Sequence, residues 1–85
     1  MEWNPQVRQK LDSMIVKIPV FHRRITEVAV TKVAEESAKK RNASFVEEED
    51  VVGAFFSGVP SPFYSMMVRL LEQSGFDYKQ YGYGK

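Results

Sequence analysis

The chain has 85 residues, of which 44% are apolar and 27% charged, and its 12 Lys and Arg against 11 Asp and Glu give a net charge of +1. A chain of this length holds one small domain, which buries only about 60% of the surface that the unfolded chain exposes. The lack of Cys excludes disulfide frameworks, thiolate metal sites and cysteine nucleophiles. A single histidine, His22, offers too few ligands for a typical transition-metal site. We therefore expect neither a cofactor nor a bound metal.

Charge and hydropathy also limit the partners. A net charge of +1 argues against nucleic acid as a partner, because such binding relies on a basic surface. No stretch approaches the roughly 18 apolar residues that cross a bilayer, and residues 1–5 lack the basic and apolar regions of a secretory signal. The sequence thus predicts a cytoplasmic protein that binds no membrane.

The first half of the chain predicts two helices joined at a proline. Asn4 followed by Pro5 is typical of a helix start, because the Asn side chain accepts from a first-turn amide and Pro has no amide to leave unpaired. We expect this first helix over residues 5–16. Pro19 ends it and begins a second helix, which meets no Gly or Pro before Arg41. The second helix should be about 30 Å long and form the spine of the domain.

The third helix is expected after a break at residues 42–44 and a short extended link at residues 45–46. The four acids at residues 47–50 suit the positive end of a helix dipole. They lack the alternating spacing and the glycine of a calcium loop, so they indicate a helix start rather than a cation site. Gly53 weakens this helix by about 1 kcal/mol relative to alanine, unless a neighbouring element approaches closely there. Gly58 is expected to end it.

A fourth helix is predicted between a proline-rich connector and Gly75. Ser61 is a candidate cap, Pro62 takes the first helical position, and Phe76 is expected to fold back on the last turn. Residues 77–85 show no periodicity and are predicted to form a flexible tail rich in Tyr and Gly.

These elements predict an all-α fold, a small four-helix domain over residues 1–76 with the long second helix at its centre. Wide apolar faces at helical spacing are what such packing requires. The predicted core consists of Trp3, Leu11, Ile15, Ile18, Phe21, Ile25, Val28, Val33, Val51, Phe55, Met67 and Leu70.

No constellation of catalytic residues is visible. Spacing places no second His, Ser or Cys beside His22, so a surface histidine is favoured over a catalytic one. The methionines and phenylalanines are expected to fill the core, with a partner-binding groove as the alternative. Among polar residues, the candidates for partner binding are His22, Arg23 and Arg24.

The other cations of the second helix, at residues 39–41, lie about 24 Å from the first-turn arginines. Glutamates at positions 27, 35 and 36 lie between the two groups. This interleaving favours a solvated charged surface over a phosphate-binding one.

The run from Ile18 to Arg23, with Trp3 before it and Ala29 and Ala34 after it, resembles a known helical family. This family is found at the carboxyl end of the B subunit of light-independent protochlorophyllide reductase and also as free-standing small proteins. The resemblance covers residues 3–54, and Val20, His22 and Glu47 depart from the usual residues. It implies a corner at Pro19, with Ile18 and Phe21 packed on either side as a staple and Trp3 covering the junction.

For function, the resemblance implies a non-catalytic interaction or accessory module of a larger redox enzyme. In the reductase, the iron–sulfur and substrate chemistry belongs to the large body of the enzyme, and likeness to the appendage does not transfer that reaction. An independent enzyme is kept as a further hypothesis, since an appendage can contribute residues such as His22 and Arg23 to the active site of a partner.

The order of the elements also resembles the histone fold, so the helix-loop-helix arrangement is partly histone-like. Residues 45–51 resemble the second loop and third-helix start of that fold. This predicts, as the alternative, a histone-fold-like dimer with weak DNA binding, because a net charge of +1 argues against DNA wrapping. The expected protein partner is therefore a larger reductase or a second copy in a homodimer.

Overall fold

The computed structural model describes residues 1–84, and Lys85 lies outside the described part of the chain. The elements in chain order are β1 (Glu2–Trp3), α1 (Pro5–Ile15), α2 (Val20–Lys40), β2 (Phe45–Val46), α3 (Glu48–Gly58), the 3-10 turn η1 (Ser61–Phe63), α4 (Tyr64–Gln73) and the 3-10 turn η2 (Tyr78–Tyr81). The all-α class with a long second helix is confirmed, and α1 and α2 end within one residue of their predicted ends.

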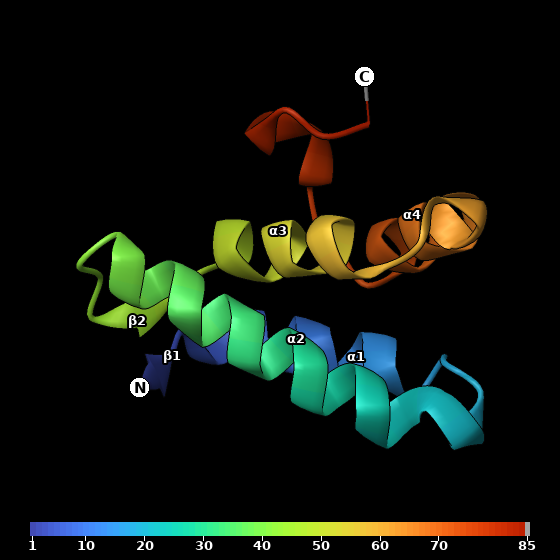
Figure 1. Ribbon diagram of the computed structural model, residues 1–85, viewed down its shortest axis with the longest axis horizontal. Coiled ribbons are helices and arrows are strands. Elements are labelled where there is room, and N and C mark those ends of the chain that lie inside the picture. The colour runs from blue at the N-terminus through green and yellow to red at the C-terminus, as the bar shows by residue number, and fades with distance from the viewer. Residues whose placement is uncertain (85) are drawn as a thin grey trace.

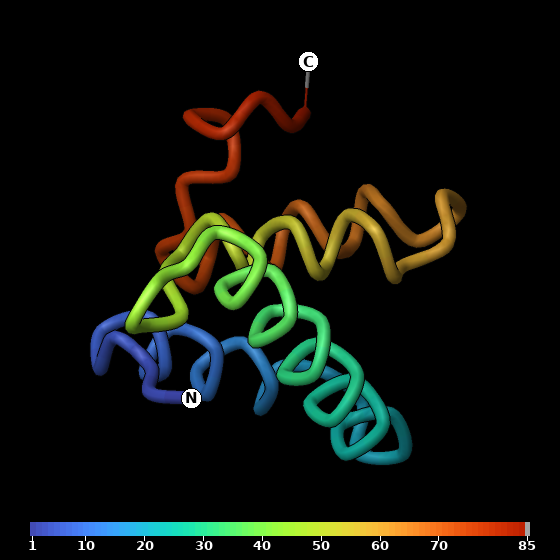
Figure 2. The backbone as a smooth tube through the Cα atoms, turned by 60° about the vertical axis from the view of Figure 1, so that its left-hand side comes forward, coloured from blue at the N-terminus to red at the C-terminus, as the bar shows by residue number. Residues whose placement is uncertain are grey.

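The helices form two layers. α1 and α2 make one layer, α3 and α4 make the other, and η2 lies on the outer side of α3 (Figures 1 and 2). The chain turns between α1 and α2 at Pro19, whose backbone is extended with φ −52° and ψ 140°. A parallel pair of short strands, in which Trp3 lies opposite Val46, ties the start of the chain to the link between α2 and α3. Sequence reasoning expected the extended link but not its partner strand.

Left-handed residues end two of the helices. Asn42, with φ 59°, follows α2, and the amide of Ala43 donates to the carbonyl oxygen of Ala38 at 3.0 Å. Gly75, with φ 88°, follows α4, and the amide of Phe76 donates to the carbonyl oxygen of Leu71 at 3.0 Å. Both are Schellman motifs, which satisfy carbonyl groups of the last turn. The predicted stop at Gly75 with a folded-back Phe76 is therefore confirmed.

The helix starts agree with prediction at α1 but not at α4. The Asn4 Oδ1 atom accepts from the amide of Gln6 at 2.9 Å, and Pro5 is the first helical residue. Ser61 does not cap α4, because it lies inside η1, and α4 begins three residues later without a side-chain cap. Two prolines near Ser61 make the connector enter the helix through a tighter turn.

The core draws on both layers. Of the predicted core, Leu11, Ile15, Val51, Phe55 and Met67 are buried. Three more predicted residues are partly buried and pack against the core: Trp3, Ile18 and Leu70.

The predicted core face of α2 is wrong. Phe21, Ile25 and Val28 are 90%, 72% and 60% exposed, and Val33 is also exposed. The face that packs on α3 is instead the line of Val30, Ala34 and Ala38. Apolar residues lie on both sides of α2, and the side with small alanines lets a second helix approach closely. Periodicity alone does not distinguish the two sides.

The corner between α1 and α2 also differs from the predicted staple. Phe21 points into solvent rather than packing beside Pro19. Trp3 does not cover the junction, because it precedes α1 whereas Pro19 follows it, and α1 is about 16 Å long. The Trp3 indole instead donates to Glu35 Oε2 at 3.0 Å.

The segment after Phe76 packs on the domain, which differs from the expected free tail. Tyr78 is buried, and the Tyr83 ring stacks on Phe56 with ring centroids 4.6 Å apart. A Cβ atom added to Gly53 would lie 3.3 Å from the Tyr83 hydroxyl. This close approach explains why a glycine stands inside the helix despite its low helix propensity. Packing therefore continues beyond residue 76, where the domain was predicted to end.

Candidate functional site

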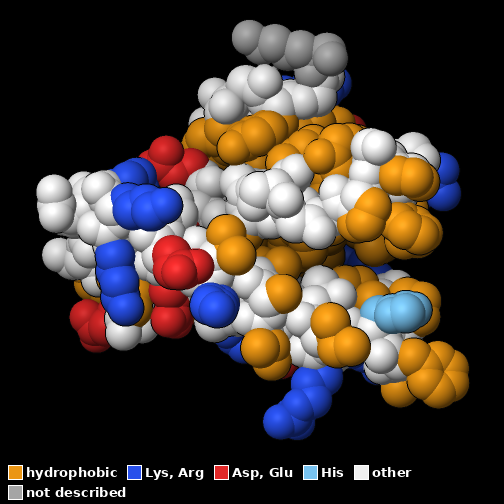
Figure 3. Space-filling view, viewed as in Figure 1, with side chains coloured by type: hydrophobic (Ala, Val, Ile, Leu, Met, Phe, Trp, Pro, Cys, Tyr) orange, Lys and Arg blue, Asp and Glu red, His pale blue; other side chains and the backbone are white. Residues whose placement is uncertain are grey.

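An apolar groove lies between the N-terminal half of α2 and the chain that forms α3, η1 and α4. Its volume is about 520 Å³, and His22 is the one titratable side chain among the residues that line it. In Figure 3, apolar side chains gather on both sides of this hollow, whereas charged side chains gather over the C-terminal end of α2. The floor of the groove is formed by the buried side chains of Met14, Val30, Phe55 and Met67.

The groove exists because α2 packs on α3 through only part of its length. The buried residues of α2 begin at Val30, so residues 20–29 contribute no fully buried side chain. α3 ends at Gly58, and Pro60 then leads the chain into η1 and α4. The two layers therefore diverge toward the corner at Pro19, and the space between them is lined by apolar side chains.

Exposed apolar side chains continue from the groove over the outer side of α2. We call this surface the apolar face. It consists of Phe21, Ile25, Val28, Ala29 and Val33 on α2 with Phe63 and Met66 on the opposite wall. Sequence analysis favoured a place in the core for Phe21, Phe63 and Met66 and kept a partner-binding groove as the alternative. Along the chain the members of the face look the same as core residues.

The three predicted partner-binding residues have different surroundings. His22 is exposed and lines the groove. The Arg23 guanidinium is committed to the corner, since Nε donates to the carbonyl oxygen of Ile18 at 2.7 Å and Nη2 to that of Val16 at 2.8 Å. Arg24 is exposed and forms no ion pair within residues 1–84. The structure thus brings His22 to the groove and gives Arg23 a structural contact.

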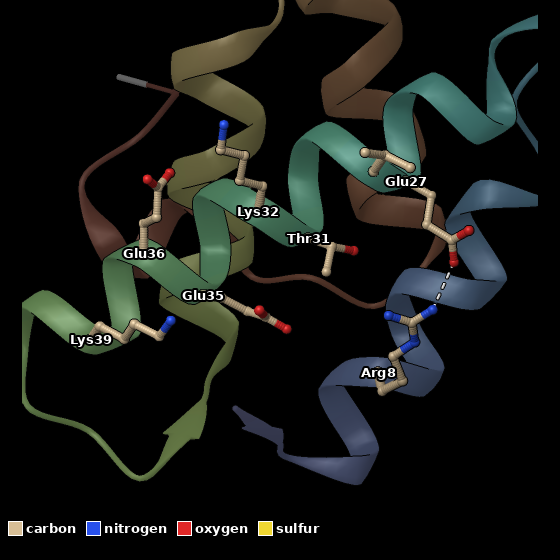
Figure 4. Close-up of a pocket in the computed structure, with 8 residues that line it drawn as sticks. Arg8, Glu27, Thr31, Lys32, Glu35, Glu36 and Lys39 are labelled. Atoms are coloured by element: carbon tan, nitrogen blue, oxygen red, sulfur yellow. Dashed lines mark hydrogen bonds and ion pairs between the residues drawn. The ribbon is translucent and has the colours of Figure 1, made fainter.

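A shallow polar hollow lies between α1 and the outer side of α2, where Thr31 and Glu35 point toward the space beside α1 (Figure 4). Arg8 Nη2 bonds Glu27 Oε2 at 2.7 Å, and its guanidinium also lies over the Trp3 ring. Glu35 accepts from the Trp3 indole. Thr31 Oγ1 is buried without a hydrogen-bond partner among the described residues. Arg8, Glu27 and Glu35 are engaged in contacts that join β1 and α1 to α2, so we assign this part of the hollow to holding those elements together.

The C-terminal half of α2 is joined to α3 by a buried carboxylate. Asp50 is fully buried and accepts from Ser37 Oγ at 2.7 Å, from Arg41 Nε at 3.0 Å and from the amide of Glu47 at 2.9 Å. Burial alone raises the pKa of Asp50, but these hydrogen bonds and the charge of Arg41 outweigh it and hold the pKa below its usual range. The four acids therefore open α3, as predicted, and one of them also clamps it to α2.

A second acid of α3 anchors the segment after Phe76. Glu48 pairs with Lys10 and accepts from the amide of Asp77 at 3.1 Å and from the Tyr81 hydroxyl at 3.2 Å. Burial raises the pKa of Tyr81 first, and the negative charge of Glu48 adds to it, so that the pKa reaches about 12. These contacts belong to the packed side of α3, away from the groove.

No group of three or more His, Asp or Glu side chains within residues 1–84 could hold a metal ion. No single described helix is long and apolar enough to cross a membrane, although α3 and η1–α4 taken together pass on length and composition with a 120° bend between them.

No family model, no curated protein and no solved structure matches the chain. The resemblances to the reductase appendage and to the histone fold stay predictions.

Proposed function

We propose that this protein is a non-catalytic interaction module that binds a protein partner through the apolar face. The observation that carries this proposal is the exposure of Phe21, Ile25 and Val28 beside an apolar groove. Six large side chains of the face are at least 37% exposed, with Phe21 at 90% and Ile25 at 72%. Exposed apolar side chains gathered on one surface mark interaction sites, whereas single scattered ones are ordinary.

The chemistry of the groove supports binding rather than catalysis. Its lining offers His22 and the Thr26 hydroxyl, but no second titratable side chain that could complete an acid–base pair. General acid–base and nucleophilic sites require such pairs within hydrogen-bond reach. The paired acids, Asp50 and Glu48, lie at the other end of the domain and hold helices together.

The partner class comes from the sequence resemblance. We propose that the module is an accessory of a larger redox enzyme in the cytoplasm, as the likeness to the appendage of protochlorophyllide reductase implies. The apolar face supports this, because an appendage needs a surface by which to attach to the body of an assembly.

The experiment is site-specific photo-cross-linking in the source cell. A photoreactive residue at Val28, within the face, should give a defined protein adduct that Ile25→Glu removes. The same group at Lys40, on the same helix but outside the face, is the matched control. Equal adducts at both positions, or none at Val28, would overturn the proposal. Identification of a redox-enzyme subunit in the Val28 adduct tests the partner class separately.

The histone-fold-like alternative is kept because exposed cations follow the outer side of α2. Lys32, Lys39 and Lys40 are all exposed, and the order of α2, β2 and α3 is the one that the likeness requires. Under this alternative, a DNA duplex should be retarded at low salt and released as salt rises. No shift at low salt would remove the DNA-binding hypothesis and leave the interaction module unaffected.

A further inference from the structure

We infer that the apolar face takes one amphipathic helix of a partner protein, whose apolar stripe is flanked by acidic residues. This inference rests on the proposed function and names the chemistry of the partner. It follows from the shape of the groove, its length and the charges at its border.

The shape and length fit a helix. The groove lies between α2 and the chain that forms α3, η1 and α4, and such a channel accepts the apolar side of another helix at positions i, i+3, i+4 and i+7. From His22 to Val33 the α2 wall spans 12 residues, or about 18 Å, which is a little over three helical turns. A volume of about 520 Å³ holds a few large side chains from such a stripe. A flat bilayer surface would leave this concave volume unfilled.

The charges at the border favour an acidic partner. Arg24 and Lys32 are exposed and lie one helical turn before and after Val28 of the apolar face, and Arg69 is exposed one turn after Met66. None of these three cations forms an ion pair within the described chain. Two of the acids nearby are already occupied, since Glu27 pairs with Arg8 and Glu35 accepts from Trp3. Glu36, which is also exposed, lies within one turn of Lys32, Lys39 and Lys40.

The same charges disfavour a second copy of this chain as the occupant. Two copies meeting through the apolar face would bring Arg24, Lys32 and Arg69 of both chains toward one interface. Like charges at an interface suppress association, whereas complementary ones steer it. The chain as a whole is nearly neutral, so the excess of cations is local to this face.

The test uses two designed 18-residue helical peptides with the same leucine stripe, one flanked by Glu and the other by Lys. Binding of each labelled peptide to the full chain is followed by fluorescence anisotropy. At low ionic strength the Glu peptide should bind about tenfold more tightly, and the preference should shrink as salt screens the border charges. Ile25→Ser should weaken both peptides, because it removes apolar contact without touching the charges.

A charge reversal makes the test specific. The double variant R24E/K32E should prefer the Lys peptide, whereas K39E/K40E, which reverses two charges on the same helix farther from the groove, should keep the wild-type order. Circular dichroism checks that each variant folds, which is expected because all four side chains are exposed. Equal binding of the two peptides, or a preference for the Lys peptide by the wild type, would overturn the inference.

Other occupants give distinct results. Sedimentation of the chain alone, showing a dimer that Ile25→Glu dissociates, would assign the face to a second copy. Ile25-dependent binding to vesicles of anionic phospholipid, without a preference between the peptides, would assign it to a lipid surface. Either result overturns the acidic-helix inference. The proposed function fails separately, through the absence of a Val28 cross-link in the cell.

Discussion

The two halves of α2 have similar amounts of apolar residues but opposite surroundings. In the C-terminal half, Val30, Ala34 and Ala38 are buried against α3. In the N-terminal half, Phe21 and Ile25 are among the most exposed large side chains of the protein. Alanines in the C-terminal half let the axes of α2 and α3 approach closely, whereas residues 20–29 contribute no fully buried side chain. One end of the helix therefore supports the fold, and the other end presents a binding surface.

Arg41→Ala is expected to have the largest effect on the free energy of unfolding. The variant leaves the carboxylate of Asp50 buried without its cation, and breaking such a pair costs about 3–5 kcal/mol of unfolding free energy. Urea denaturation monitored by circular dichroism measures the loss. Lys40→Ala, at the neighbouring exposed position, is the control and should change stability by no more than about 0.5 kcal/mol. A loss below 1 kcal/mol for Arg41→Ala would mean that the pair of Arg41 and Asp50 does not stabilise the packing of α2 on α3.

Two alanine-to-leucine substitutions compare the halves directly. Ala34→Leu forces three extra carbons against α3 and should cost about 1–3 kcal/mol, because the site is fully buried. Ala29→Leu, on the exposed side of the same helix, should change stability by no more than about 0.5 kcal/mol. Thermal unfolding of the two variants side by side provides the measurement. Similar losses at both positions would contradict the assignment of the two sides of α2.

Glu48→Gln tests whether Glu48 holds the segment after Phe76 against α3. The pKa of Tyr81 should fall from about 12 toward its ordinary value near 10, since the carboxylate no longer disfavours the phenolate. In the wild type this contribution to stability is complete below pH 10 and is lost as the pH rises from 10 toward 12. Absorbance of tyrosinate during alkaline titration follows the change, with Glu36→Gln as the control. An unchanged titration curve would show that Glu48 does not hold Tyr81.

The smallest effect is expected for Phe21→Ser. A side chain that is 90% exposed contributes little to folding, so the free energy of unfolding should change by no more than about 0.5 kcal/mol. The same substitution at the buried Phe55 should cost about 3–5 kcal/mol. Chemical denaturation at low protein concentration gives both values. A loss above 1.5 kcal/mol at Phe21 would place that ring in the core and contradict the exposure of the N-terminal half of α2.

Local signals predicted most helix boundaries, with the start of α4 as the exception. Asn4 with Pro5, Pro19, and Gly75 with Phe76 each act on their own turn of backbone, so their effects are readable from neighbouring residues. Long-range contacts were not readable in this way. The pairing of Trp3 with Val46 and the anchoring of Tyr81 by Glu48 join residues far apart in the sequence.

The candidate site was predicted only in part. His22 lines the groove and Arg23 hydrogen-bonds the corner, and a partner-binding role for His22, Arg23 or Arg24 stays a prediction. The apolar face itself was assigned to the core, because a stripe of large apolar residues on a long helix is usually buried. Choosing between the two sides of α2 required knowing how close α3 approaches, which depends on packing rather than on periodicity.

The two hydrogen bonds from Arg23 to the carbonyl oxygens of Val16 and Ile18 fix the corner between α1 and the exposed N-terminal half of α2. A corner fixed in this way leaves little loop motion to be frozen when a ligand arrives. Association at this surface should then resemble docking onto a preorganised receptor, with a single kinetic phase and a rate governed by encounter rather than by slow rearrangement.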